Sequence, residues 1–409
     1  MLKKIRAYDL QVGMYVVDTG LSWVDYPYLY CQEGLLESDA QVAALRAEGF
    51  AEAFIETDKT KLSCDSSRIY DSAEVNKAMD EALLESFAMA RTNKNVPLNQ
   101  EFTAAVSVHG RSVEVVRGIM EALANNTPLD GQAATDVSRD IAGSVARNRD
   151  ALICLAKLHD EGEYSFRHSV SVSAIAAAFG DYLGLGRPQV GELALAGLMH
   201  DVGKALSPKD LLVKPEALSA EEQARLKHHP IESCAAVSAR MDVPQQVLRA
   251  IAEHHERFDG SGYPRGIKAS EQSYYGQILA IADVFDALTQ DRPYKARLMP
   301  DKAMSVMFAM RGKDFEPKLL EHFVKCVGLY TVGSLVRLSS GERAVVRESN
   351  PHSPLRPKVS ILFDADMQPI HPVLMDLSGK EGPAPARPLD VCEILDHRHH
   401  GFEARHHLL

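Results

Sequence analysis

The chain has 409 residues, a formal net charge of -11 and a hydrophobic fraction of 45%. This composition is typical of a globular protein, and the length predicts two or three domains rather than one core. The negative charge excludes a surface built for duplex nucleic acid, so an anionic ligand would need a locally positive site.

The cysteines and the N-terminus indicate a cytosolic protein. No Cys-x-x-Cys pair is present, and the wide spacing is typical of reduced thiols at Cys31, Cys64, Cys154, Cys234, Cys326 and Cys392. The N-terminal residues run into mixed polar sequence without an apolar signal segment, and no stretch approaches the ~18 apolar residues of a membrane span. We therefore expect a soluble, cytoplasmic chain without a membrane span.

The first 60 residues or so contain short β-rich runs broken by glycine. Residues 13–17 and 53–55 predict strands, and residues 38–47 between them predict a helix. Residues 59–100 are polar and predict a connecting region around one amphipathic helix near residues 73–91. We expect residues 1–135 to form a small α+β domain with its linker.

Helical periodicity dominates from Phe102 to about Lys325. Apolar residues recur every three or four positions, as at Val172, Ile175 and Phe179. This pattern predicts an all-helical domain.

Alternating strand patterns follow Gly328 and predict a small β-rich module over residues 331–409. The predicted strands are residues 334–338, 344–347 and 359–363, separated by turn-forming sequence. The tail from Gly379 is rich in Pro, Ala, His and Arg, so we expect it to be loose.

Histidine and aspartate residues recur through the helical region. Those that stand out are His168, His200, Asp201, His229, His254, His255 and Asp283. Imidazole and carboxylate groups suit divalent first-row metals, and adjacent side chains at His200 and Asp201 can reach two neighbouring ions with the carboxylate as a bridge. An isolated histidine more often has a structural role, but this set together predicts a two-metal centre that activates a bridging water for attack at phosphorus.

The same residues stand in motifs that resemble a known family. The runs His200–Lys204 (HDVGK), His254–Pro264 (HHERFDGSGYP), Ile281–Thr289 (IADVFDALT) and Arg292–Lys295 (RPYK) are similar to motifs of the HD-GYP branch of the HD superfamily of metal phosphohydrolases. The resemblance covers roughly residues 136–330 and implies an all-α, HD-type catalytic domain there. Residues 1–135 look like a companion, regulatory domain often found before HD-GYP domains.

The resemblance implies a set of metal ligands and a metal count. The ligands it implies are His168, His200, Asp201, His229, His254, His255 and Asp283, with Asp201 as the bridging carboxylate. Some family members hold a third ion through a glutamate one helical turn before the first histidine, where this chain has Tyr164. We therefore expect two divalent ions, with iron or manganese preferred and other first-row metals open.

The resemblance also implies the substrate contacts. Lys204 would contact the scissile phosphate, while Arg292 and Lys295 would bind the other phosphate or a guanine edge. Tyr263 would line the substrate cleft, and Asp286 would orient a ligand or a substrate amine. These cations would form the local positive site that the net charge lacks.

The activity implied is hydrolysis of the phosphodiester bonds of cyclic di-GMP to pGpG, GMP or both, which lowers this second messenger in bacterial signalling. A bridging hydroxide would attack phosphorus while the metals and Lys204 stabilise the developing charge. Two alternatives stay open: a nucleotide phosphohydrolase of the same superfamily, and a catalytically weak cyclic di-GMP sensor or docking module for diguanylate cyclase (GGDEF) domains. Homodimerisation is a further expectation, without a predicted interface.

Overall fold

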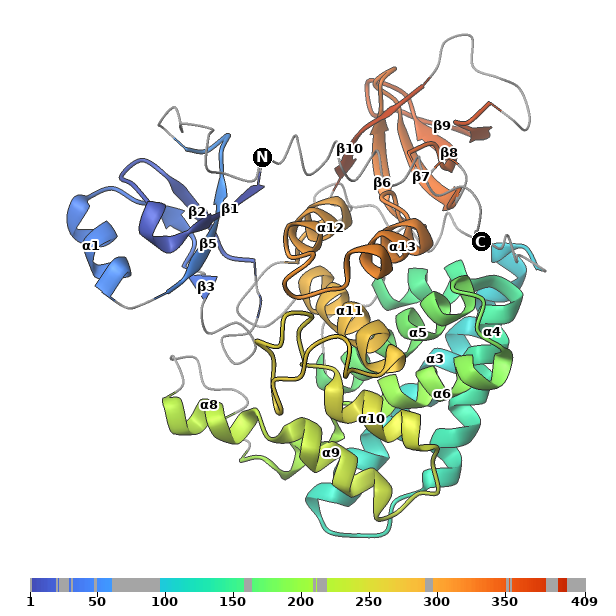
Figure 1. The fold of residues 1–409 in the computed structure, drawn as a ribbon. Coiled ribbons are helices and arrows are strands. Elements are labelled where there is room, and N and C mark those ends of the chain that lie inside the picture. The colour runs from blue at the N-terminus through green and yellow to red at the C-terminus, as the bar shows by residue number, and fades with distance from the viewer. Residues whose placement is uncertain are drawn as a thin grey trace.

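A helical body and two five-stranded sheets make up this computed structural model (Figure 1). It describes residues 2–19, 21, 29–30, 32–47, 50–60, 96–157, 164–208, 211, 219–290, 297–350, 353, 355–379 and 389–395. In Figure 1 the N-terminal sheet lies beside α12, and the C-terminal sheet lies above α12 and α13. The predicted multidomain class, helical with a β-containing module at each end, is confirmed.

The N-terminal sheet has the antiparallel order β1-β5-β2-β4, and β3 pairs in parallel with β5. Its elements are β1 (Leu2–Arg6), the 3-10 helix η1 (Ala7–Asp9), β2 (Tyr15–Val17), β3 (Leu29–Tyr30), β4 (Gly34–Leu35), α1 (Asp39–Ala47) and β5 (Glu52–Glu56). The strands and the helix expected here are confirmed. The helix expected near residues 73–91 falls outside the described residues.

Charged contacts attach this sheet to the helical body. Glu52 of β5 pairs with Lys4 at 2.9 Å and with Lys313, which follows α12, at 3.1 Å. Residues of this N-terminal part such as Leu10, Val16 and Ile55 are fully buried in a core cluster of their own. The N-terminal sheet therefore has its own apolar core and a partly polar contact with the body.

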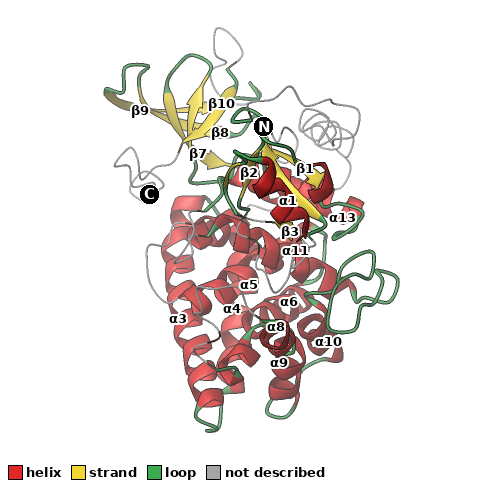
Figure 2. Cartoon of the chain, turned by 90° about the vertical axis from the view of Figure 1, so that its left-hand side faces the viewer, coloured by secondary structure: helices red, strands yellow, loops and turns green. Residues whose placement is uncertain are grey.

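The helical body carries the predicted 3.6-residue periodicity into packed helices. They are α3 (Leu98–Ala124), α4 (Gly131–Lys157), α5 (Tyr164–Tyr182), α6 (Arg187–Met199), η3 (Val202–Leu206), α8 (Ala220–Leu226), α9 (His229–Ser238), α10 (Gln245–Glu253), α11 (Tyr274–Thr289), α12 (Pro300–Ala309) and α13 (Pro317–Val327). Figure 2 shows the long helices α3 and α4 side by side, and both pack against α5 and α6. The division of the chain near residue 135 stays a prediction.

The C-terminal sheet shares its core with the helices. Its antiparallel order is β10-β6-β7-β8-β9. The strands are β6 (Leu335–Leu338), β7 (Arg343–Glu348), β8 (Lys358–Phe363), β9 (Pro369–Asp376) and β10 (Val391–Leu395). Val336, Val345 and Val359 belong to the same buried cluster as the helical body. Ser349 donates a hydrogen bond to Asp150 of α4 at 3.1 Å, which adds a buried polar contact between the two parts.

Two strands of this sheet depart from the sequence expectations. The tail from Gly379 was expected to be loose, which is wrong for residues 391–395, because β10 pairs with β6. Strand β9 was not expected, and its two prolines, Pro369 and Pro372, hide the strand pattern. Proline is tolerated there because β9 lies at the edge of the sheet. Both strands depend on partners distant in the sequence.

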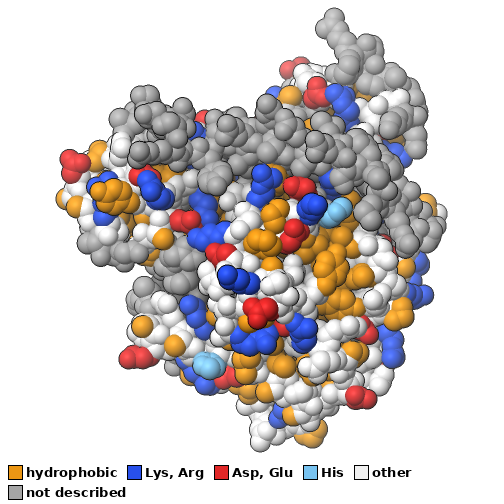
Figure 3. Space-filling view, in the orientation of Figure 1, with side chains coloured by type: hydrophobic (Ala, Val, Ile, Leu, Met, Phe, Trp, Pro, Cys, Tyr) orange, Lys and Arg blue, Asp and Glu red, His pale blue; other side chains and the backbone are white. Residues whose placement is uncertain are grey.

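The surface carries charges of both signs. Figure 3 shows basic and acidic side chains interspersed with apolar ones on one face of the molecule. None of the helices in the described parts of the chain combines the length and apolarity needed to cross a membrane.

Candidate metal centre

The predicted ligands come together from the ends and inner faces of five helical segments. His200 follows the last residue of α6, His254 and His255 follow α10, and His229 opens α9. His168 lies on α5 and Asp283 on α11. Every predicted ligand is at most 7% exposed, and Asp283 is the most exposed of them.

Three of these histidines share one local hydrogen-bond pattern. The Nδ1 atoms of His200, His229 and His254 lie 2.7–2.8 Å from the backbone carbonyl three residues earlier, at Gly197, Leu226 and Ile251. A carbonyl only accepts hydrogen bonds, so Nδ1 carries the proton and Nε2 keeps its lone pair. Because those carbonyls belong to the last turn of a helix, each ring both satisfies a helix end and directs Nε2 away from it. This hydrogen-bond pattern was not predicted from the sequence.

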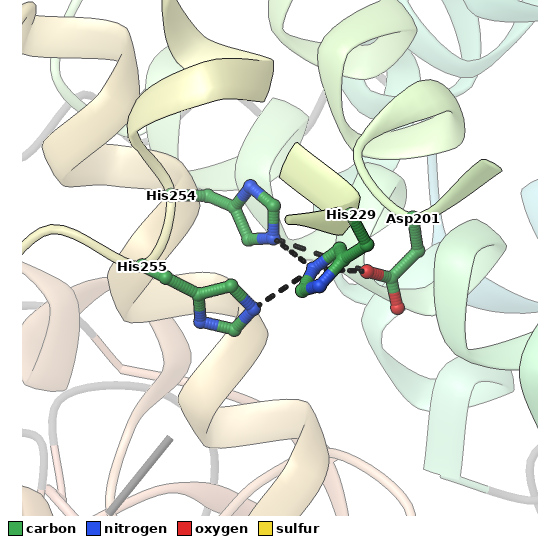
Figure 4. A group of neighbouring side chains, drawn as sticks. All are labelled: Asp201, His229, His254 and His255. Carbon is green, nitrogen blue, oxygen red and sulfur yellow. Dashed lines mark hydrogen bonds and ion pairs between the residues drawn. The ribbon is translucent and has the colours of Figure 1, made fainter. Parts of the chain in front are cut away.

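The ligand atoms form two groups. One comprises Asp201, His229, His254 and His255, and the other comprises His168, His200 and Asp283; within each group the candidate atoms lie within 4.8 Å of one another. Figure 4 shows the first group, with the three rings and the carboxylate of Asp201 directed toward one another.

Asp201 lies between the two groups. Its Oδ1 atom is 3.2 Å from Nε2 of His229, and its Oδ2 atom is 3.4 Å from Nε2 of His200 and 3.8 Å from Nε2 of His168. Each carboxylate oxygen therefore faces a different group. This is the arrangement that a carboxylate shared by two adjacent cations requires.

Asp283 and Asp286, one turn apart on α11, contact opposite sides of His168. Nε2 of His168 is 3.0 Å from Oδ1 of Asp283, and Nδ1 is 2.7 Å from Oδ2 of Asp286. Burial raises the pKa of Asp286, although the hydrogen bond from His168 opposes this. Asp286 thus contacts Nδ1 of His168, the ring nitrogen that points away from Asp283.

The protonation states suit cation binding. Burial and the neighbouring histidines hold the pKa values of His254 and His255 well below the ordinary value, so both rings are neutral. Burial acts to raise the pKa of Asp201, but electrostatic interactions with the neighbouring His200 and Lys204 side chains outweigh it and hold that pKa well below its usual range. Burial likewise acts to raise the pKa of Asp283, but the close contact with His168 outweighs it and lowers that pKa.

The lone pairs of this cluster face one another. Nε2 of His229 lies 3.4 Å from Nε2 of His254 and 3.2 Å from Nε2 of His255. Nε2 of His200 is buried and has no hydrogen-bond partner among the described residues. Neutral nitrogen lone pairs and ionised carboxylates at these distances repel unless a positive charge lies between them. The residues therefore fit divalent cations held by nitrogen and oxygen ligands.

Of the basic side chains predicted to contact the substrate, only Lys204 lies among the described residues. Nζ of Lys204 lies 2.5 Å from Oδ2 of Asp201, and its side chain is 32% exposed, so it borders the cluster. Arg292 and Lys295 fall outside the described residues, as does the side chain of Tyr164, on which the expectation of no third ion depends.

Tyr263 forms one wall of the site. Its ring stacks on His255 with centroids 4.7 Å apart and also lies 6.4 Å from the ring of His229. Its backbone N–H donates to the carbonyl of His255 at 3.1 Å. The half-buried Tyr263 therefore covers one side of the cluster while part of it stays open to solvent.

Buried acidic residues hold the loop that carries Tyr263. The Glu256 carboxylate accepts hydrogen bonds from the backbone N–H groups of Arg265 at 2.8 Å and Ile267 at 3.1 Å. The Glu253 carboxylate accepts from the Arg265 guanidinium at 2.8 Å and from the Ser273 N–H at 2.6 Å. Sequence reasoning missed both glutamates, although Glu256 directly follows His254 and His255.

Replacing Asp286 with asparagine is expected to lower metal affinity 10–100-fold, the usual effect of losing a carboxylate that orients a histidine ligand. The side-chain volume is kept, but the neutral amide supports the Nδ1 proton of His168 more weakly. Competition with a metal chelator measures the affinity. Unchanged affinity would show that His168 needs no support from Asp286.

Comparisons with known proteins agree with this layout. A family model described as an HD domain matches residues 152–319. A model described as a domain of unknown function (DUF3391) matches residues 2–134, and one described as a KOW domain associated with HD domain matches residues 335–382. The first match spans all the predicted ligands.

Curated relatives match the chain to different extents. The Pseudomonas aeruginosa protein named cyclic di-GMP phosphodiesterase PA4108 is 34% identical over 384 residues, which is 93% of this chain and 90% of that protein. The Xanthomonas campestris cyclic di-GMP phosphodiesterase response regulator RpfG is 35% identical over 183 residues, or 44% of this chain and 48% of that protein. A Vibrio cholerae 3'3'-cGAMP-specific phosphodiesterase 1 is 37% identical over 148 residues, or 36% of this chain and 34% of that protein. The first similarity thus extends along nearly the whole chain.

Proposed function

The chain belongs to the HD-GYP family of metal-dependent HD domain phosphodiesterases, and from this membership we propose that its substrate is cyclic di-GMP. The observation that carries the proposal is the position of Asp201, whose two oxygens face two separate groups of ligands. The name of the P. aeruginosa relative supports the choice of substrate, because that similarity includes both flanking modules as well as the helical domain.

Two divalent cations are proposed for this site. One would be held by His168, His200 and Asp283 and the other by His229, His254 and His255, with Asp201 shared between them. When bound, such a pair supplies Lewis-acid activation of water and neutralises charge that develops at phosphorus. Iron or manganese is our preferred identity, and the ligand types also accept other first-row metals.

The chain's own residues orient and stabilise the reacting groups. The ammonium of Lys204 lies beside Asp201, where it would stabilise negative charge on the scissile phosphate. The carboxylate of Asp286 accepts a hydrogen bond from Nδ1 of His168. Backbone carbonyls accept the equivalent hydrogen bonds from Nδ1 of His200, His229 and His254. The rigid ring of Tyr263 excludes water from one side. The products we propose are pGpG, GMP or both.

A substrate panel tests the proposed function. The metal-loaded protein is incubated with cyclic di-GMP, 3'3'-cGAMP, and nucleoside mono- and triphosphates, and the products are separated by chromatography. We expect cyclic di-GMP to be converted with the highest kcat/KM. Hydrolysis confined to the mono- and triphosphates would replace the proposal with the nucleotide phosphohydrolase alternative.

Binding without turnover is the other informative outcome. Tight binding of cyclic di-GMP by the metal-loaded protein without product would favour the sensor or docking alternative. Contact with GGDEF-domain proteins and homodimerisation stay predictions from the sequence.

A further inference from the structure

Lys227 carries a positive charge at the rim of the metal centre that the proposed mechanism does not use. It follows the last residue of α8 and precedes His229 by two positions. Its Nζ atom lies 5.4 Å from the ring centroid of Tyr263, the residue that stacks on His255. Lys227 and Tyr263 are both half-buried, so this edge of the site is accessible to a ligand.

The charge of Lys227 is not neutralised by a carboxylate within the described part of the chain. Nearby cations differ in this respect: Arg225 of α8 pairs with Glu232 at 3.2 Å, and Arg265, close to Tyr263 in the chain, pairs with Glu253 at 2.8 Å. The contact of Lys227 with an aromatic face holds the ammonium in place without cancelling its charge. Its N–H donors therefore remain available for an anion.

The two lysines of the site occupy different positions. Lys204 lies directly against Asp201. Lys227 pairs with neither Asp201 nor Asp283, and its ammonium lies over the ring of Tyr263 instead. A ligand anion at the cluster would meet Lys204. A second anion on the same ligand, displaced toward Tyr263, would meet Lys227.

We propose that Lys227 binds the second, non-scissile phosphate of the substrate and thereby selects cyclic dinucleotides over diesters that carry one phosphate. This inference rests on the proposed function, because it assigns the substrate two phosphates. It adds a described residue to the substrate contacts that the family resemblance implied. An ammonium held by the ring loses little freedom when it binds, which makes the contact effective at a partly solvated rim.

The test compares one substrate that has two phosphates with one that has a single phosphate. Lys227→Met keeps the aliphatic stem over Tyr263 and removes the charge. We expect its KM for cyclic di-GMP to rise about tenfold, the effect of losing one charge-assisted hydrogen bond, with kcat within about twofold. Its kcat/KM for bis(4-nitrophenyl) phosphate should match that of the unmodified protein, and Lys227→Arg should restore the KM for cyclic di-GMP.

A matched control and a binding measurement separate the outcomes. Lys318→Met makes the same change at an exposed lysine on α13 and should leave both substrates unaffected. An unchanged KM in Lys227→Met, or an equal loss on both substrates, would overturn the role of Lys227. Isothermal titration with cyclic di-GMP accompanies the kinetics. If the unmodified protein neither binds nor hydrolyses cyclic di-GMP, the proposed function falls, and this inference falls with it.

Discussion

Asp201→Ala is expected to reduce kcat for phosphodiester hydrolysis by about 10³-fold or more, because loss of a shared metal ligand removes several kcal/mol of transition-state stabilisation. The carboxylate faces both groups of ligands, with Oδ1 3.2 Å from His229 and Oδ2 3.4 Å from His200. The substitution also removes the ion pair between Asp201 and the ammonium of Lys204. We expect the variant to lose bound metal as well as activity.

The measurement combines metal content with product analysis. The protein is purified anaerobically, its metals are quantified, and conversion of cyclic di-GMP is followed by chromatography. Asp201→Asn is a second variant that keeps the size of the side chain, so the same loss in both variants cannot be attributed to misfolding caused by a cavity. Asp366→Ala, in an exposed turn of the C-terminal sheet, is the matched control and should retain full metal loading and activity. Activity that survives the loss of metal would place the active site elsewhere.

Gly203→Ala is expected to lower the free energy of unfolding by about 1–3 kcal/mol, the usual cost of overpacking a filled core. A Cβ atom at Gly203 would lie 2.5 Å from the carbonyl oxygen of His229 and 2.5 Å from the backbone nitrogen of Ser233. Both are backbone atoms of α9, so the helix itself must move. Because α9 carries His229, we also expect activity to fall about 10²-fold, as for a displacement of about 1 Å at a reacting centre.

Gly191→Ala provides the matched control in the same part of the fold. A Cβ atom there meets only the Ala142 Cβ, at an ordinary contact distance of 3.9 Å. Since Gly191 lies inside α6, alanine should stabilise the protein by up to about 1 kcal/mol through helix propensity. Urea denaturation of the metal-free and metal-loaded proteins gives the free energy of unfolding of both variants. Equal stability and activity in the two variants would show that α9 can shift without affecting the site.

Much of the site could be predicted from the sequence because its residue types are chemically specific. Histidine and aspartate in HDVGK and HHERFDGSGYP identify metal chemistry, and the structure brings every predicted ligand into one buried region. Their grouping could not be predicted, since it depends on how α5, α6, α9, α10 and α11 cross. Lys227 has no signal in the sequence, because its interest arises only from its contact with Tyr263.

In the fold, too, some elements could be predicted from the sequence and others could not. Strands such as β2, β5 and β8 could be predicted because their residues alternate or run apolar over short stretches between turn-forming sequence. Strand β10 could not, because five residues beside a Pro-rich segment become a strand only when β6 supplies hydrogen-bond partners. Strand β9 includes Pro369 and Pro372, and an edge position with β8 on one side accommodates them.

The sequence by itself determined the helical catalytic domain, its flanking modules and the chemistry of the ligands, because periodicity and residue type are local properties. The tertiary structure decided which oxygen of Asp201 faces which group and which imidazole nitrogen is free to bind a cation. It also placed Lys227 over Tyr263. These features depend on distances between helix ends far apart in the chain, and packing of the common core sets those distances.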